Sequence, residues 1–214
     1  MTKFEAEPRS DCPRCPHLVR FRRAQRAAFP DWHNAPVPSF GPLEARLLIV
    51  GLAPGLRGAN RTGRPFTGDF AGELLYATLA KFDFAHGHYG ASADDGLLLV
   101  DCRISNAARC VPPENKPLPA EIAACRPFLA AEMAAMKRLA FVLALGRVAH
   151  EAVLAALDLK RSAFPFRHGA FHALRPGLML ASSYHCSRYN TNTGKLTTAM
   201  FEGVFEELRR RLSG

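Results

Sequence analysis

Short apolar runs alternate along the chain with polar segments and with stretches of helical periodicity. Apolar runs of this kind, bounded by glycine, proline or polar residues, predict strands that are buried on both faces. The predicted strands occupy residues 47–50, 97–100, 139–145 and 178–182. Apolar residues spaced three and four apart predict helices, which occupy residues 71–82, 120–139, 147–157 and 196–212. The alternation predicts an α/β fold, a three-layer α/β/α sandwich with a central, mostly parallel four-stranded sheet.

Unusual polar segments follow three of the predicted strands, at residues 51–69, 104–110 and 183–195. Because the carboxyl ends of parallel strands lie at one edge of a sheet, we expect the three segments to meet in a single cleft. The first segment is rich in glycine and arginine, which suits close backbone approach to an anionic ligand. It lacks the Gly-Lys-Ser/Thr of a nucleotide P-loop and the GxGxxG of dinucleotide-binding folds. A glycine-rich turn without a ligand is the simpler alternative.

The beginning of the chain differs from the rest. Residues 1–45 are irregular and rich in proline, with one short basic helical stretch at residues 18–29. We expect this arm to wrap around the sheet rather than to join it. The length of the chain predicts one domain over residues 1–214, including the arm.

Lysine and arginine outnumber aspartate and glutamate by 28 to 19, which gives a net charge of +9. A basic balance of this size favours a polyanionic partner, with nucleic acid ahead of an anionic membrane surface. No apolar run approaches the roughly 20 residues of a membrane span, and the N-terminus has no apolar signal core. We therefore expect a cytoplasmic protein that binds nucleic acid, has no membrane partner and is by default a monomer.

Six cysteines in a protein of the reducing cytoplasm indicate metal binding or chemistry rather than disulfides. Cys12 and Cys15 form a chelating pair in a polar stretch, whereas Cys110 lies in a predicted loop and Cys125 on a predicted helix. The four thiols predict either a tetrahedral zinc site or an iron–sulfur cluster, and their spacing does not decide between these. A closed four-cysteine site is structural and would tie down the N-terminal arm. Buried thiols without a metal are the alternative.

Three motifs and the cysteine pattern together carry a resemblance to a known family. GLAPGLRGANRTGRPFTGD resembles the first motif of the uracil-DNA glycosylase superfamily, ISNAARCVPPENKP its central motif and SYHCSRYNTNTGKLT its histidine loop. The cysteines resemble the cluster ligands of families 4 and 5, and the whole chain is most similar to the iron–sulfur family 5 (type b) enzymes. The resemblance implies a structural 4Fe–4S cluster held by Cys12, Cys15, Cys110 and Cys125.

The resemblance also implies a monofunctional DNA-repair glycosylase. Such an enzyme flips uracil, or another deaminated base such as hypoxanthine, out of DNA and hydrolyses its N-glycosidic bond, leaving an abasic site. By the same resemblance, Phe66 stacks on the base and Asn106 hydrogen-bonds its edge. Gly51 and Ala53 lie beside the base in the opening turn. His185 donates a hydrogen bond to the carbonyl oxygen that gains negative charge. The alternatives are a core position for Phe66 and a turn-bridging role for Asn106.

The group that positions the attacking water is less evident. Other families of the superfamily place an acid or amide in the opening turn, where this chain has Leu52 and Ala53, a lack that family 5 shares. Asp69 is our first candidate for the water or the sugar cation, and Asn60 the second. The alternative role of Asp69 is to cap the helix that follows it. Cys186 stands where the histidine loop of relatives commonly carries proline.

Five cations in the first and third segments are candidates for DNA phosphate contacts. They are Arg57, Arg61, Arg64, Arg188 and Lys195. A function of a different class is a non-catalytic nucleic-acid-binding module, in which the four cysteines hold zinc and the glycine loop grips phosphate. The missing acid in the opening turn favours this alternative. A phosphate-ester enzyme is disfavoured, since the chain has no evident carboxylate cluster for a divalent metal.

Overall fold

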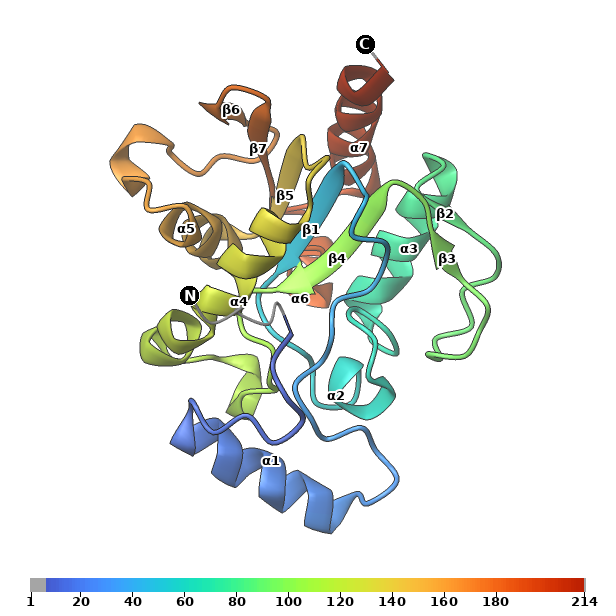
Figure 1. The fold of residues 1–214 in the computed structure, drawn as a ribbon. Helices are drawn as coiled ribbons and strands as arrows, with labels where there is room; N and C mark the ends of the chain where they lie inside the picture. The colour runs from blue at the N-terminus through green and yellow to red at the C-terminus, as the bar shows by residue number, and fades with distance from the viewer. Residues whose placement is uncertain (1–6, 214) are drawn as a thin grey trace.

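The computed structural model describes residues 7–213, so residues 1–6 of the predicted arm lie outside it. A five-stranded sheet with the order β4-β1-β5-β7-β6 forms the centre of the protein (Figure 1). The strands are β1 (Leu47–Gly51), β4 (Cys102–Asn106), β5 (Phe141–Leu145), β6 (Phe171–Arg175) and β7 (Leu178–Ser183). All neighbours are parallel except β6 and β7. The predicted three-layer α/β/α sandwich with a mostly parallel sheet is confirmed, with five strands in place of four.

The sheet is buried on both faces because its apolar strands supply side chains to two cores. Leu47 and Ile49 of β1 belong to one core, and Leu48 and Val50 belong to the other. All four side chains are fully buried. Successive side chains of a strand point to opposite faces, so an uninterrupted apolar run is what a doubly covered strand requires.

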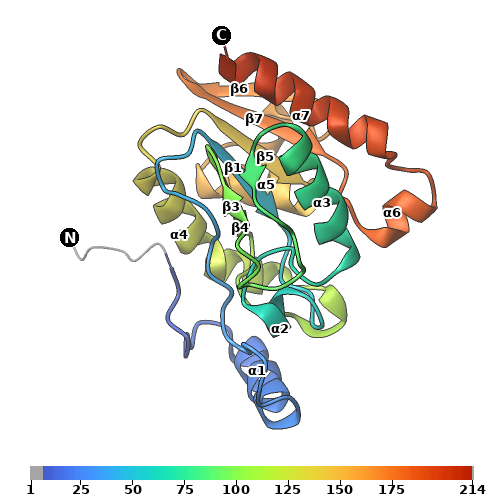
Figure 2. The same ribbon diagram turned by 90° about the vertical axis from the view of Figure 1, so that its right-hand side faces the viewer.

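Helices cover both faces of the sheet (Figure 2). Leu75 and Phe205 bring α3 and α7 onto the first core, and Leu129 and Val153 bring α4 and α5 onto the second. The bounds of the helices are α1 (Pro16–Ala28), α2 (Ala59–Thr62), α3 (Phe70–Lys81), α4 (Pro119–Ala135), α5 (Arg147–Ala156), α6 (Arg188–Asn192) and α7 (Thr198–Ser213), with 3-10 turns at Pro113–Asn115 and Arg161–Ala163. No helix within the described residues is long and apolar enough to cross a membrane.

The second strand of the parallel sheet differs from the prediction. Within the predicted strand at 97–100, only β3 (Leu98–Leu99) is a strand, and it pairs with β2 (Ala85–His86) in a separate antiparallel hairpin. The Leu98 side chain is 66% exposed, so this run is not buried on both faces. The parallel strand is β4, whose sequence CRISN carries the polar residues Arg103 and Ser105 and therefore gives no apolar run.

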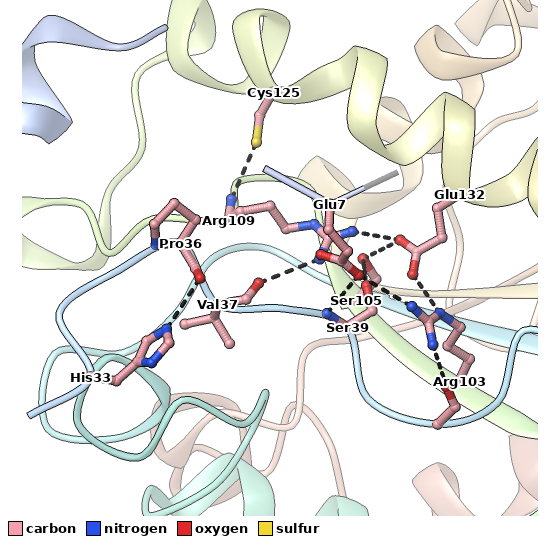
Figure 3. A network of polar contacts seen from close by, with 11 residues as sticks. Glu7, His33, Pro36, Val37, Ser39, Arg103, Ser105, Arg109, Cys125 and Glu132 are labelled. Atoms are coloured by element: carbon pink, nitrogen blue, oxygen red, sulfur yellow. Dashed lines mark hydrogen bonds and ion pairs between the residues drawn. The ribbon is translucent and has the colours of Figure 1, made fainter. Parts of the chain in front are cut away.

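A buried network of charges accounts for the polar side chains of β4 (Figure 3). Glu132 of α4 accepts hydrogen bonds from Arg103 Nε and Arg109 Nη2, each at 2.7 Å. It also accepts one from Ser105 Oγ at 2.7 Å. Glu7 of the N-terminal arm accepts from the same two arginines, at 3.2 and 3.0 Å. The network joins β4, the segment after it, α4 and the arm, because each buried charge needs these partners.

The prediction also missed β6. This strand lies at the edge of the sheet, with its residues exposed or only half-buried, so it lacks the apolar run of a central strand. It forms an antiparallel hairpin with β7 through a turn that contains Gly177 at φ +77°, a left-handed conformation that glycine adopts readily. At the opposite edge, Phe40 of the arm forms an isolated antiparallel bridge with Ile104 of β4.

Candidate functional site

The carboxyl ends of the parallel strands border a cavity of about 690 Å³. The turn after β1, at residues 52–59, forms one wall of the cavity, together with Phe66 and the start of α3. Asn106 from the end of β4 and His185 from the segment after β7 complete it. The predicted meeting of the three strand-end segments in one cleft is confirmed.

Gly51, Phe66 and Asn106 pack closely at the base of the cavity. A Cβ atom on Gly51 would lie 2.4 Å from Asn106 Oδ1 and 2.6 Å from Phe66 Cζ, so a larger residue here would displace both side chains. Asn106 is 3% exposed, and its Oδ1 has no hydrogen-bond partner within residues 7–213. A buried amide oxygen without a partner is costly, which makes Asn106 a ready acceptor for a ligand donor.

The backbone of Phe66 adopts a rare conformation. Its φ angle is +53°, in the left-handed region that a bulky residue seldom occupies. Its ring lies nearly parallel to the imidazole of His185, with the ring centroids 6.0 Å apart and an interplanar angle of 28°. Strained residues of this kind gather at ligand sites, where the surrounding structure holds them in place. Phe66 therefore presents a flat apolar wall to the cavity.

His185 is held by its backbone while its ring nitrogens remain available. Its carbonyl oxygen accepts a hydrogen bond from Asn190 Nδ2 at 2.8 Å. No group in the described part of the chain hydrogen-bonds the ring nitrogens. Burial disfavours the charged imidazolium and lowers the pKa of His185 to about 4. The ring is therefore neutral at pH 7, with one N–H donor.

The neutral state of His185 gives a testable pH dependence. Because the folded-state pKa of about 4 lies below the unfolded value of 6.5, the folded protein binds fewer protons between these two values. The contribution of His185 to stability is thus complete above pH 6.5 and is lost as the pH falls toward 4. We expect its ring resonances, identified in NMR spectra by their absence from His185→Ala, to titrate near pH 4. A midpoint near 6.5 would contradict a buried neutral imidazole.

The two candidates for positioning water occupy different places. Asp69 lines the cavity and also caps α3, since its Oδ1 accepts from the Gly72 backbone N–H at 3.0 Å. Burial raises the pKa of Asp69. Asn60 is fully buried, donates to Asn34 Oδ1 at 2.9 Å and is not part of the cavity wall. Of the two, only Asp69 is in reach of a ligand in the cavity.

Most of the predicted DNA-binding cations are exposed around the cavity. Arg57 and Arg188 line its mouth, and Arg61 lies on the same loop as Arg57. Arg188 lies over the Phe70 ring, at 5.3 Å from its centroid. Lys195 is exposed beyond α6. These four side chains are exposed, and two of them, Arg57 and Arg188, line the cavity.

Arg64 is the exception and corrects the prediction. Its side chain is buried and forms a bidentate ion pair with Asp95, with N–O distances of 2.7 and 2.6 Å. Its guanidinium also lies 5.0 Å from the centroid of the Phe40 ring. Local sequence patterning does not predict this pairing, because Asp95 lies 31 residues further along the chain. Arg64 thus stabilises the loop and is unavailable to DNA.

Two features near the site were not expected from the sequence. Asn115, in the second half of the central motif, lines the cavity in the left-handed region at φ +58°. Tyr189, the neighbour of Arg188 on α6, is 74% exposed. An aromatic residue within the polar, non-periodic part of the histidine loop is the one signal that could have identified Tyr189.

The four predicted metal ligands line a second, small cavity between the arm and α4. Cys12, Cys15, Cys110 and Cys125 all contribute to its wall. Burial, and then the neighbouring sulfurs of Cys125 and Cys12, raise the pKa of the Cys15 thiol to about 11. Within residues 7–213, however, no group of three or more histidine, cysteine, aspartate or glutamate side chains is arranged to hold a metal ion.

The charges around this cysteine cavity suit an anionic group. Arg22 is buried, and it donates to Cys110 Sγ at 3.3 Å and to the Cys12 carbonyl at 3.1 Å. Its Nε has no partner, and no carboxylate of the described residues pairs with it. The Arg109 backbone N–H donates to Cys125 Sγ at 3.3 Å (Figure 3). Donors aimed at sulfur, beside a buried cation that forms no ion pair within residues 7–213, suit cysteine sulfurs that carry negative charge as metal ligands.

Cys186 of the histidine loop is fully buried, and its thiol donates to the Ala71 carbonyl at 3.5 Å. Burial raises the pKa of this thiol to about 12, so Cys186 is not an activated nucleophile. It instead packs the histidine loop against the start of α3.

Comparison with known proteins agrees with this geometry. The sequence model of the Uracil DNA glycosylase superfamily matches residues 38–209. A protein of Thermus thermophilus named type-5 uracil-DNA glycosylase is 45% identical over 205 residues, which cover 93% of each chain. A protein of the same name from Pyrobaculum aerophilum is 39% identical over 94% of this chain and 87% of its own length. A type-4 uracil-DNA glycosylase of Archaeoglobus fulgidus is 34% identical over 58% of this chain and 55% of its own.

Proposed function

Because the chain belongs to the uracil-DNA glycosylase superfamily, it removes uracil from DNA, and we propose that the strand-end cavity receives the flipped nucleotide. The observation that carries this proposal is the unpaired Oδ1 of Asn106 at the base of the cavity. A uracil N–H supplies the missing donor, and the Asn106 amide N–H₂ supplies a donor for a uracil carbonyl. The ring of Phe66 stacks on the base, and Gly51 leaves room for the Asn106 amide and the Phe66 ring.

His185 stabilises the departing base. Cleavage of the N-glycosidic bond leaves a cationic sugar and a base anion whose charge spreads onto its carbonyl oxygens. The neutral imidazole donates its N–H to one of these oxygens, in a buried site where such a bond is stronger than in water. The low pKa of His185 means that it acts as a hydrogen-bond donor and not as an acid that transfers a proton at pH 7.

Asp69 is our candidate for stabilising the sugar cation and orienting water. Asp69→Asn keeps a good helix cap, so α3 stays intact, but it removes the negative charge. We expect single-turnover uracil excision to fall about 10²-fold or more in Asp69→Asn. Asp69→Ala, which loses cap and charge, is expected to show the same kinetic defect and a lower melting temperature. If Asp69→Asn excised uracil at the wild-type rate, the role of Asp69 would be limited to capping α3.

We also propose how DNA lies on the protein. Arg57, Arg61, Arg188 and Lys195 contact phosphates around the mouth of the cavity. Tyr189 occupies the gap that the flipped nucleotide leaves, since apolar side chains at such sites insert between base pairs. We propose that the protein acts as a monomer in the cytoplasm. It leaves the strand uncut, because no lysine among residues 7–213 lines the cavity to form a Schiff base.

A 4Fe–4S cluster is our proposal for the cysteine cavity, with zinc as the alternative. Cys12, Cys15, Cys110 and Cys125 hold the cluster, and the Arg22 guanidinium offsets its negative charge. The bound cluster supplies structural cross-links between the arm, the segment after β4 and α4. The donors to Cys110 and Cys125 sulfur support thiolate ligands, which both the cluster and zinc use.

The base range of the enzyme is tested with matched duplexes that carry one uracil or one hypoxanthine. We propose that both bases are released, because an amide can present a donor or an acceptor to either base edge. Free base is measured by mass spectrometry, and end-labelled strands are examined before and after alkali. Release of uracil alone would restrict the proposal to uracil. Release of neither base, or strand cleavage without alkali, would contradict it.

A further inference from the structure

The loop between β2 and β3, residues 87–97, supports the turn that carries Phe66. The Tyr89 hydroxyl donates to the Phe66 carbonyl at 3.3 Å and accepts from the Gly68 backbone N–H at 3.2 Å. It therefore bridges the residues on either side of Thr67, where the backbone has φ angles of +53° at Phe66 and +85° at Gly68. A single side-chain oxygen spans the strained part of the turn.

Tyr89 is itself held firmly. Its ring stacks on Tyr76 of α3, with the centroids 4.6 Å apart and an interplanar angle of 24°. The Tyr76 hydroxyl donates to the Pro65 carbonyl at 2.6 Å. Asp95 of the same loop accepts the backbone N–H of Gly90 at 2.9 Å while it pairs with Arg64. Apart from the buried Leu97 and the half-buried Tyr89 and Asp95, the loop is exposed, and the latter two are the side chains of the loop that bond to residues 64–68.

The opposite side of the Phe66 carbonyl packs against α3. A Cβ atom on Gly72 would lie 1.7 Å from the Phe66 oxygen and 2.8 Å from the Tyr89 hydroxyl. The glycine thus lets the carbonyl and the hydroxyl meet on the helix surface. A left-handed phenylalanine persists only where its surroundings fix it, and here the contacts with Tyr89 and Gly72 do so.

We propose that Tyr89 is a positioning residue for base recognition, whose hydroxyl holds Phe66 in the left-handed conformation that turns its ring into the cavity. The inference rests on the stacking role proposed for Phe66. Without the hydroxyl, the turn relaxes toward ordinary backbone angles and the ring no longer faces Gly51 and His185. The base then binds less well, while the hydrogen-bond donor His185 and the cation-stabilising Asp69 stay in place.

Tyr89→Phe tests the proposal, because it removes one oxygen and keeps the stacked ring. We expect kcat/KM for uracil excision to fall about tenfold, as for the loss of one hydrogen bond, with most of the change in KM. His88→Ala is the matched control, since His88 is exposed on the same loop. The melting temperature and visible absorbance of each variant verify its fold. An unchanged KM in Tyr89→Phe would overturn the proposal.

A double-mutant cycle shows whether Tyr89 acts through Phe66. In a Phe66→Leu background, which lacks the stacking ring, Tyr89→Phe is expected to change KM less than twofold. A second full tenfold effect there would place the role of Tyr89 elsewhere and overturn the proposal. Fluorescence of 2-aminopurine beside the uracil, which reports base flipping, should fall in both single variants. If the wild-type protein released no uracil, the proposed function would fail instead, so the two failures are distinguishable.

Discussion

Replacement of His185 by alanine is expected to lower the single-turnover rate of uracil excision about 10²–10³-fold. The structure supplies the reason, since the buried neutral ring faces the cavity and its nitrogens have no partner among the described residues. Loss of this donor leaves the charge on the departing base without its hydrogen-bond donor. The rate is measured with protein in excess over an end-labelled duplex that carries one uracil.

The matched control for this variant is His86→Ala. His86 is exposed on β2 and is not part of the cavity wall, so its removal should leave the excision rate unchanged. DNA affinity, measured by fluorescence anisotropy, should stay within a few-fold of the wild type in both variants, because the phosphate contacts remain. A wild-type excision rate in His185→Ala would contradict the proposed role of the imidazole as a hydrogen-bond donor to the departing base.

Cys110→Ser is expected to cause the second large effect, a colourless protein with a much lower melting temperature. Loss of a structural metal site is among the most destabilising single changes, and about 5 kcal/mol corresponds to a fall of about 10–20 °C. Excision should fall as well, because Cys110 and Asn106 lie on one short segment. That segment is anchored by Arg109, which pairs with Glu132 and donates to Cys125 Sγ.

Iron content, visible absorbance and thermal unfolding measure this effect together. Cys102→Ala is the matched control, since Cys102 is fully buried but lies outside the cysteine cavity. It should lose stability through packing and keep its iron and colour. A Cys110→Ser protein with full iron content and wild-type colour would contradict the proposed ligand set. Stoichiometric zinc without colour in the wild type would favour the alternative metal.

The sequence predicted those strands and helices whose buried side chains are apolar. The runs at 47–50 and 139–145 are strands because both of their faces lie in a core. The strand β4 was missed because its buried side chains are polar and are satisfied by Glu132, a partner far away in the chain. The DNA contact predicted for Arg64 was wrong for the same reason, since the ion pair with its buried partner Asp95 cannot be predicted from the local sequence.

The candidate site was more predictable than the groups that support it. The topology of a parallel sheet brings the ends of β1, β4 and β7 to one edge, so Phe66, Asn106 and His185 could be expected to meet there. The supporting contacts are long-range and specific to side-chain geometry. Tyr89 lies in a loop without periodicity, and its hydrogen bond to the Phe66 carbonyl has no sequence signature.

The most direct test of the account is a single measurement on the wild-type protein. An end-labelled duplex with one uracil is saturated with protein, as monitored by anisotropy, and is then treated with alkali. We predict that the strand stays intact before alkali and is cleaved afterwards at the uracil alone, which reveals an abasic site. Saturated binding with no cleavage after alkali would contradict the account and would support a non-catalytic DNA-binding module.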